Sequence, residues 1–456
     1  MLKLSLASIA EATQGHAYGA DVHVECVSTD SRKHAANALF VALRGEQHDA
    51  HGFLAQARGN GAVAALVERR IDTDLAQVVV ADTQIALGLL AAHVRRQRDV
   101  CVIGITGSNG KTTVKTLLAG ILARVAPTHA SSGSFNNEIG LPLTLLSMPE
   151  DTRFAVLEMG AGKPGDIDYL AAIAQPRIAL VNNVAPAHLE RMGSLDGVAA
   201  TKGAIYSALP ADGIAVINAD DAYAGFFAGL AGSRRVIRFG VNTQAEVMAR
   251  FDKAAPANAF TLLAAGEEID ITLPLLGRHN VNNALAAASL ALAVDVPLAA
   301  IKQGLEAASA VAGRSAQRKH ASGALIIDDT YNANPASFAA AIDTLAEFSG
   351  TRILVVGDMR ELGADGENLH ARIGTQAAAK GIDRLLAVGA LSRATATAFG
   401  SKARHFPDQA ALVEVLRGEL STATTVLIKG SRGSAMDRVV AALFAAEATA
   451  GGRHAA

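Results

Sequence analysis

From about residue 100 to the C-terminal end, short apolar runs alternate with stretches rich in alanine and leucine. We expect the apolar runs to form strands at 102–106, 154–158, 178–182, 214–218, 325–328, 353–356, 385–388 and 426–428. Continuous apolar runs bounded by polar or glycine residues are typical of strands buried on both faces, as in parallel sheets. Because the stretches between them favour helix, the alternation predicts right-handed βαβ units and an α/β fold.

Several of these predicted strands end directly in polar or glycine residues. The pairs Asp328-Asp329, Gly357-Asp358 and Lys429-Gly430 follow three of them. Ligands of open α/β sheets bind at the carboxyl ends of the strands. These strand ends are therefore where we expect the chemistry of the protein.

The chain is long enough for about three domains, because 456 residues correspond to roughly 150 residues each. The first ~95 residues differ from the rest, with polar segments at 29–32 and 44–52 between short strands. An arginine-rich segment at 95–98 precedes the first apolar run, and Ala312-Gly313-Arg314 precedes a new strand. We therefore predict domains at 1–97, 98–312 and 313–456.

Composition excludes several classes of protein. Half of the residues are hydrophobic and 18% are charged, which excludes a disordered or fibrous chain. The formal net charge of −2 provides no positive field for nucleic acid or an anionic membrane. With only Cys26 and Cys101, the chain has neither a disulfide framework nor a cysteine-based zinc cluster.

The most apolar window, 284–301, is mostly alanine and contains Asp295 and Pro297. It is far less hydrophobic than a membrane-spanning helix of leucine and isoleucine. We predict a buried helix that is ended by Asp295. We expect a soluble, cytoplasmic protein that binds no nucleic acid and is not embedded in a membrane.

The stretch 103–113 has the pattern of a phosphate-binding loop. It follows an apolar strand and precedes a plausible helix at 114–124, which is the context that such a loop requires. Glycines let backbone N–H groups turn toward phosphate oxygens, Lys111 can reach the β- and γ-phosphates, and the Thr112 hydroxyl can hold Mg²⁺. Ile105 occupies the position of the first glycine in the usual pattern, which argues against the small GTPases. A glycine turn without a ligand is the alternative.

Three more residues are candidates for the same site. Glu158 ends a predicted strand, so it is either a Mg²⁺ ligand or a paired surface acid. His188 follows the next strand, where a histidine is usually structural. Lys202 is the only charged residue between Asp196 and Asp212. It is either a helix lysine that extends to solvent or a buried amine with a lowered pKa that faces the site.

The order of these motifs resembles that of the ATP-dependent Mur ligases of peptidoglycan synthesis, over essentially the whole chain. The resemblance rests on 106–113, Asn136-Asn137, Glu158, His188, Lys202 and 279–283. Two further stretches, 328–337 and 357–363, are similar to those of members that add D-alanyl-D-alanine. The Asp-Asn-Pro-Arg motif of the member that adds a diamino acid is absent from the sequence.

The resemblance implies a small α/β N-terminal domain that binds a UDP-sugar, a central ATPase-type domain, and a Rossmann-like C-terminal domain that binds the incoming dipeptide. ATP would phosphorylate the free carboxylate of UDP-N-acetylmuramoyl-tripeptide, and the amine of D-alanyl-D-alanine would attack the acyl phosphate. Two Mg²⁺ ions are implied, one at Thr112 and Glu158 and one at His188 and a carbamylated Lys202. A monomer is typical of the family.

The resemblance also implies which residues bind the two nucleotides. The ATP-binding set is Thr106, Gly107, Ser108, Asn109, Gly110, Lys111, Thr112, Thr113, Asn280, Asn283, Arg314 and Asp329. In this set Asn280 and Asn283 are on the adenine side, Arg314 reaches the γ-phosphate and Asp329 is on the ribose side. The residues near the UDP-sugar are Ser31, Arg32, Asn136 and Asn137.

Two other functions are alternatives to that of a Mur ligase. Folylpolyglutamate synthase uses the same amide-ligase scheme, but it lacks a comparable N-terminal domain with Thr29-Asp30-Ser31-Arg32. A non-catalytic nucleotide-binding module could share the fold, because fold does not imply function. Against that alternative, each predicted catalytic position holds a chemically competent residue.

Overall fold

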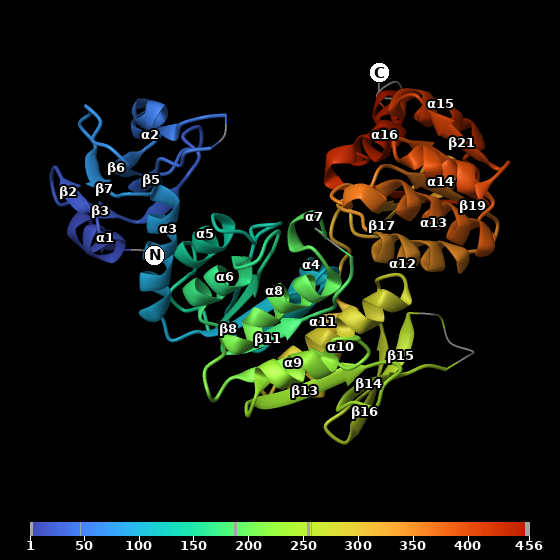
Figure 1. Ribbon diagram of the computed structural model, residues 1–456, viewed down its shortest axis with the longest axis horizontal. Coiled ribbons are helices and arrows are strands. Elements are labelled where there is room, and N and C mark those ends of the chain that lie inside the picture. The colour runs from blue at the N-terminus through green and yellow to red at the C-terminus, as the bar shows by residue number, and fades with distance from the viewer. Residues whose placement is uncertain (1–2, 46, 187–188, 253–255, 257, 452–456) are drawn as a thin grey trace.

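The computed structural model describes residues 3–45, 47–186, 189–252, 256 and 258–451. Figure 1 shows the N-terminal part in blue and the C-terminal part in orange to red, at opposite ends of the molecule. The green and yellow central part lies between them. Each part is built around a β-sheet of its own.

The N-terminal sheet has the strand order β2-β7-β6-β5-β4. Its strands are β2 (His16–Tyr18), β4 (Cys26–Ser28), β5 (Ala38–Val41), β6 (Ala62–Val67) and β7 (Ala76–Val79). β2 pairs antiparallel with β7, and the other neighbours are parallel. The remaining elements of this part are β1 (Leu4–Ser5), β3 (His23–Val24), α1 (Leu6–Thr13), α2 (Leu54–Gly59), α3 (Thr83–Arg96) and a short 3-10 helix at Ala50–Phe53.

The central sheet has the order β16-β15-β14-β13-β12-β11-β8-β10-β9 and is parallel except at β14, β15 and β16. Its strands are β8 (Cys101–Thr106), β9 (Thr128–Ala130), β10 (Phe154–Glu158), β11 (Ile178–Val181), β12 (Ile214–Asn218), β13 (Arg235–Gly240), β14 (Val247–Arg250), β15 (Ala259–Ala264) and β16 (Glu267–Thr272). Its helices are α4 (Lys111–Leu122), α5 (Gly140–Leu146), α6 (Asp166–Ala174), α7 (Leu189–Met192), α8 (Leu195–Ser207), α9 (Ala224–Ala231), α10 (Arg278–Leu292) and α11 (Leu298–Glu306).

The C-terminal sheet has the order β17-β18-β22-β19-β20-β21, and among the described strands of this sheet only β17 pairs antiparallel, with β18. Its strands are β17 (Ala316–Lys319), β18 (Leu325–Asp329), β19 (Thr351–Val356), β20 (Arg384–Val388), β21 (Ala403–Phe406) and β22 (Thr424–Lys429). Its helices are α12 (Pro335–Ala346), α13 (Gly366–Ala379), α14 (Ser392–Phe399), α15 (Gln409–Glu419) and α16 (Asp437–Gly451), with short 3-10 helices at Gly363–Asp365 and Arg432–Ser434.

The alternation of apolar runs predicted eight strands of the two larger sheets: β8, β10, β11, β12, β18, β19, β20 and β22. All eight expected strands are present, with ends within two residues of the prediction, and the α/β fold is confirmed. The sequence did not predict β9, β13, β17 and β21, nor the antiparallel edge formed by β14, β15 and β16. In this edge β14 and β15 alternate buried residues with less buried ones, and β16 is mostly exposed, so the edge lacks the fully buried runs of the sheet centre.

The apolar window at 284–301 contains two helices rather than one. α10 begins earlier, at Arg278, and ends at Leu292, and α11 begins at Leu298. Asp295 lies between them in a left-handed conformation, with φ of 57°. Across the part of the chain that the structure describes, no helix has the length and apolarity needed to cross a bilayer.

A buried tyrosine ties α8 to the central sheet. Tyr206 is 0% exposed, and its hydroxyl donates to the Val216 carbonyl at 2.6 Å and accepts from the Val181 N–H at 2.9 Å. Tyr206→Phe leaves both backbone groups buried without this partner. We expect it to lower the free energy of unfolding by about 1–3 kcal/mol in urea denaturation.

Tyr169→Phe is the matched control for this prediction. Within the described structure the buried Tyr169 hydroxyl has no hydrogen-bond partner, so its removal should cost no stability. Equal effects of the two substitutions would show that the Tyr206 hydroxyl does not hold α8 to the sheet.

Candidate active site

A cavity of about 720 Å³ lies between the central and C-terminal parts. It is lined by the loop after β8, by the loops that follow β10 and β11, by the start of α10, and by residues at the ends of β18 and β22. β8 is parallel to β10 and β11, and β18 is parallel to β22, so within each sheet these carboxyl ends lie at the same edge. Among the described residues, the lining begins at Ser108 and includes none from the N-terminal sheet.

The loop between β8 and α4 depends on two glycines. Gly107 has φ of 145° and Gly110 has φ of 80°, which side chains other than glycine rarely adopt. A Cβ at Gly110 would also overlap the side-chain amides of Asn283 and Asn182. The loop therefore takes a shape that only glycine permits at these positions.

Two asparagines that follow β11 hold this loop from the side. Asn183 Oδ1 accepts from the Asn109 N–H at 2.8 Å, and Asn183 Nδ2 donates to the Asn109 carbonyl at 3.1 Å. Asn182 Nδ2 donates to the same carbonyl at 3.0 Å. Ser108 exchanges hydrogen bonds with the Ala185 backbone at 2.9 and 3.0 Å. The loop is thus fixed on both sides of Asn109.

Lys111, the first residue of α4, turns its side chain back over the loop. Its Nζ donates to the Gly107 carbonyl at 2.7 Å. Burial, together with the nearby Arg314 guanidinium, lowers the pKa of Lys111, and the Glu158 carboxylate opposes this shift. The amine is thereby held over the loop carbonyls, where a phosphate group would enter.

The Glu158 carboxylate, at the end of β10, is 1% exposed and fully hydrogen-bonded. Its Oε2 accepts from the Thr112 hydroxyl at 2.7 Å and lies 3.5 Å from Lys115 Nζ. Its Oε1 accepts from Asn136 Nδ2 at 2.8 Å. Burial acts to raise the pKa of Glu158, but the charges of Lys111 and Lys115 and these hydrogen bonds outweigh it and lower the pKa. The carboxylate is therefore ionised near neutral pH.

Thr112 and Glu158 fit one Mg²⁺ ion. They bring hydroxyl and carboxylate oxygens together, and Mg²⁺ in phosphate sites uses one or two carboxylates with phosphate and water oxygens. The described residues contain no group of three or more His, Cys, Asp or Glu side chains suited to a metal ion. Any metal here would therefore depend on oxygens from a bound phosphate. The other predicted ligand, His188, lies outside the described residues.

Lys202 lies on α8 and is 1% exposed. Among the residues that the structure describes, its amine has no hydrogen-bond or ion-pair partner. Burial, with a smaller effect of the Lys111 charge, lowers the pKa of Lys202 to about 7, while Asp166 opposes the shift. The sequence left two possibilities for this lysine, and the structure rules out the one that extends to solvent.

Asn280 and Asn283 lie on the first turns of α10 and continue the hydrogen-bond network of the loop. Asn283 Oδ1 accepts from Asn182 Nδ2 at 2.9 Å, and Asn283 Nδ2 donates to Asn280 Oδ1 at 3.0 Å. Asn280 Nδ2 in turn donates to the Leu276 carbonyl at 2.7 Å. Both asparagines line the cavity.

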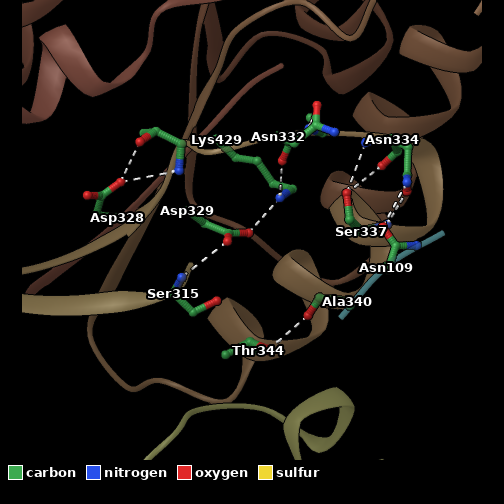
Figure 2. Close-up of polar contacts among 12 residues, drawn as sticks. Asn109, Ser315, Asp328, Asp329, Asn332, Asn334, Ser337, Ala340, Thr344 and Lys429 are labelled. Atoms are coloured by element: carbon green, nitrogen blue, oxygen red, sulfur yellow. Dashed lines mark hydrogen bonds and ion pairs between the residues drawn. The ribbon is translucent and has the colours of Figure 1, made fainter. Parts of the chain in front are cut away.

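Arg314 and Asp329 reach the cavity from the C-terminal side. The Arg314 guanidinium stacks 4.2 Å from the centre of the Tyr331 ring, and its Nε is buried without a partner among the described residues. Asp329 pairs with Lys429, with 2.6 Å between Oδ2 and Nζ, and accepts from the Ser315 N–H at 3.1 Å (Figure 2). Both residues line the cavity.

The structure does not bring all the predicted substrate residues together. Asn136 contacts Glu158, and Asn137 Oδ1 accepts from the Gly140 N–H at the start of α5. Ser31 instead donates to Gln56 Oε1, and Arg32 pairs with Asp30. These last two belong to the N-terminal part and lie outside the cavity lining.

Sequence reasoning assigned no site role to four residues that line the cavity, Asn182, Asn183, Asn334 and Lys429, or to Lys115, which contacts Glu158. A signal existed for most of them. Asn182 and Asn183 close a predicted strand, Lys429 closes another, and a polar residue at such a strand end marks a ligand site in an α/β sheet. Lys115 had no such signal, because it lies inside a helix and its partner is distant in sequence.

Comparison with known proteins gives a consistent result. The family models for the Mur ligase middle domain and the Mur ligase, glutamate ligase domain match residues 105–291 and 313–432. The UDP-N-acetylmuramoyl-tripeptide–D-alanyl-D-alanine ligase of Escherichia coli (strain K12) is 45% identical, over 97% of this chain and 99% of its own.

Two solved structures share the whole fold. A crystal structure of MurF from Acinetobacter baumannii has a TM-score of 0.92 at 37% identity and covers 97% of this chain and 99% of its own. MurF ligase from Thermotoga maritima in complex with ADP has a TM-score of 0.82 at 27% identity, and the match covers 92% and 97% of the two chains.

The lowered pKa of Lys202 predicts how stability depends on pH. Between about pH 7 and the ordinary lysine pKa of 10.5, the unfolded chain binds a proton at this amine that the folded chain does not. The free energy of unfolding therefore rises with pH across this window. Lys202→Met should be more stable than the unsubstituted protein at pH 7 and should show a weaker pH dependence from pH 7 to 9.

This prediction is tested by urea denaturation in buffers free of CO₂, so that the amine stays unmodified. The exposed Lys319 provides the control, because Lys319→Met should leave the pH dependence unchanged. A Lys202→Met profile that parallels the unsubstituted protein would contradict a lowered pKa at Lys202.

Proposed function

The chain belongs to the Mur ligase family, and from this premise we propose that it is the ATP-dependent ligase that joins D-alanyl-D-alanine to UDP-N-acetylmuramoyl-tripeptide. The observation that carries this conclusion is 45% identity, over nearly the full length of both chains, to a relative named for that activity. The product is a precursor of peptidoglycan. ATP is the nucleotide, consistent with the ADP complex of the Thermotoga maritima protein.

The reaction has two steps in this proposal. An oxygen of the tripeptide carboxylate attacks the γ-phosphorus of ATP, so that ADP leaves and an acyl phosphate forms. The amine nitrogen of the dipeptide then attacks the acyl carbon, loses a proton and displaces inorganic phosphate. Phosphoryl transfer of this kind is mainly a matter of positioning and of charge neutralisation.

Lys111 and Arg314 would provide that neutralisation from opposite sides of the cavity. Lys111 Nζ lies over the loop, and the Arg314 guanidinium has an unpartnered Nε within the described structure. Thr112 and Glu158 would hold a Mg²⁺ ion, which when bound neutralises charge on the phosphate oxygens. Asn280, Asn283 and Asp329 would face the nucleoside of ATP.

We propose that Lys202 is carbamylated in the working enzyme, where with His188 it would hold a second Mg²⁺ ion. A buried amine with a pKa near 7 is partly uncharged at neutral pH, so its nitrogen can attack CO₂ and release a proton. The carbamate is an anion. The positive charge of Lys111 repels the ammonium form of Lys202 and would attract the negative carbamate in its place.

Each domain has its own part in the proposal. The domain at 1–97 would bind the UDP-sugar through Ser31 and Arg32, with Asn136 and Asn137 nearer the reacting carboxylate. The domain at 98–312 would bind ATP, and the domain at 313–456 would bind the dipeptide. The protein would act as a monomer in the cytoplasm, where precursors of peptidoglycan are made.

The alternative functions differ in what they consume. A folylpolyglutamate synthase would release phosphate with a folate and glutamate, and a non-catalytic module would release none. We expect phosphate release from ATP only when UDP-N-acetylmuramoyl-tripeptide and D-alanyl-D-alanine are both present, with one product peptide for each phosphate. Phosphate release with the folate pair would overturn the proposal.

Lys111→Ala tests the role of the phosphate loop. If the amine neutralises phosphate charge in the transition state, kcat should fall by about two to three orders of magnitude. The melting temperature should fall only modestly, because Lys115, Thr112 and Asn136 still stabilise the Glu158 carboxylate. Near-normal turnover in this folded variant would remove the phosphate-loop assignment.

Lys202→Ala tests the carbamate. The variant should be nearly inactive, because it lacks the negative charge, and a short carboxylate such as acetate should partly restore turnover by occupying the vacated space. The exposed Lys319 again provides the control, since Lys319→Ala should keep full activity and show no response to acetate. Full activity of Lys202→Ala without acetate would exclude this role.

A further inference from the structure

A hydrogen bond crosses from the C-terminal domain to the phosphate loop. Asn334 Nδ2 donates to Asn109 Oδ1 at 2.8 Å, although the two residues are 225 positions apart (Figure 2). Asn334 is 7% exposed and Asn109 is half-buried, and both line the cavity. Asn334 has no part in the function proposed above.

The orientation of the Asn334 amide is fixed by the helix that it caps. Asn334 is the N-cap of α12, and its Oδ1 accepts from the Ser337 N–H at 2.9 Å. The Ser337 hydroxyl in turn receives the Asn334 N–H at 2.9 Å, which completes a capping box. Because the oxygen is used by the helix, the amide presents its Nδ2 donor to Asn109.

This donor determines the orientation of the Asn109 amide. A donor from Asn334 requires an acceptor on Asn109, so Asn109 Oδ1 faces α12 and its Nδ2 faces away. Across the described residues, Asn109 Nδ2 has no hydrogen-bond partner. The Asn109 backbone cannot rotate to change this, because Asn182 and Asn183 hold both its N–H and its carbonyl.

We propose that Asn334 is a positioning residue. It keeps the side-chain Nδ2 of Asn109, and not the side-chain Oδ1, turned toward the phosphates of the nucleotide. A donor aimed at a phosphate oxygen is attractive, whereas a carbonyl oxygen in its place repels the same anion. Asn334 acts through Asn109 and does not itself contact the nucleotide. The position of the C-terminal domain is thereby coupled to phosphate recognition by the central domain.

Two substitutions separate this role from a structural one. Serine and aspartate are both good N-caps, so Asn334→Ser and Asn334→Asp should preserve α12 and the melting temperature. Serine is too short to reach Asn109, and the aspartate offers an acceptor instead of a donor, which turns the Asn109 oxygen toward the nucleotide. Asn334→Ala removes the cap as well as the contact to Asn109. It should therefore lower the melting temperature and serves as the control for stability.

The readout is the Kd of β,γ-methylene-ATP by calorimetry, together with KM for ATP in the ligase assay. Asn334→Ser should raise both by about threefold to tenfold, the equivalent of one neutral hydrogen bond, and Asn334→Asp should raise them further. In an Asn109→Ala background both substitutions should change the Kd by less than about twofold, because the residue through which they act is gone.

The inference rests on the proposed nucleotide function, which binding of β,γ-methylene-ATP by the unsubstituted protein tests separately. Unchanged Kd values in Asn334→Ser and Asn334→Asp would overturn the inference alone. An effect of Asn334→Asp that persists undiminished in the Asn109→Ala background would also overturn it, since it would reflect charge repulsion without Asn109.

Discussion

The Glu158 carboxylate must be stabilised in a place from which water is excluded, and the architecture of the cavity follows from that requirement. Removing an ion from water costs several kcal/mol unless partners replace the lost hydration. Here the partners are the Thr112 hydroxyl, the Asn136 amide and the charges of Lys111 and Lys115. They come from α4 and from the loop before α5. The strand end can therefore bury this charge only when these segments have packed around it, which links the folding of the central domain to the assembly of its site.

The phosphate loop is held by a different kind of interaction. Asn182 and Asn183 fix it through neutral side-chain amides, and Asn283 in turn accepts a hydrogen bond from Asn182. A loop that receives a polyanion gains nothing from carboxylate supports, and cationic supports would compete with Lys111 for the phosphate. Amides hold the backbone without adding charge to the site. The same argument explains why the contact from the C-terminal domain is also made by an asparagine, Asn334.

The sequence predicted the strands and the loop well, because both leave local signals. Continuous apolar runs marked strands buried in the centre of a sheet, and the glycines of the phosphate loop marked backbone with positive φ.

Contacts between distant segments were not predictable. Asp329 and Lys429 each close a strand, but they pair only because β18 lies beside β22 in a register that sets them opposite each other. That register depends on the strand order, which no local pattern contains. The polar residues of β16 also gave no signal, since an exposed edge strand is only weakly apolar.

Arg314 shows how the linker between two domains can become part of a site. Its neighbours Gly313 and Ser315 both have positive φ, of 73° and 54°. Ser315 is held in this conformation because its N–H donates to Asp329. On the other side of Arg314, the Gly313 carbonyl accepts from the Tyr331 N–H at 3.0 Å. Both anchors belong to the end of β18, as does the Tyr331 ring on which the guanidinium stacks. Arg314 is therefore fixed to the C-terminal sheet and not to the domain that carries the phosphate loop. The C-terminal sheet therefore brings the Arg314 charge to the cavity and contributes to the electrostatic environment of a bound phosphate.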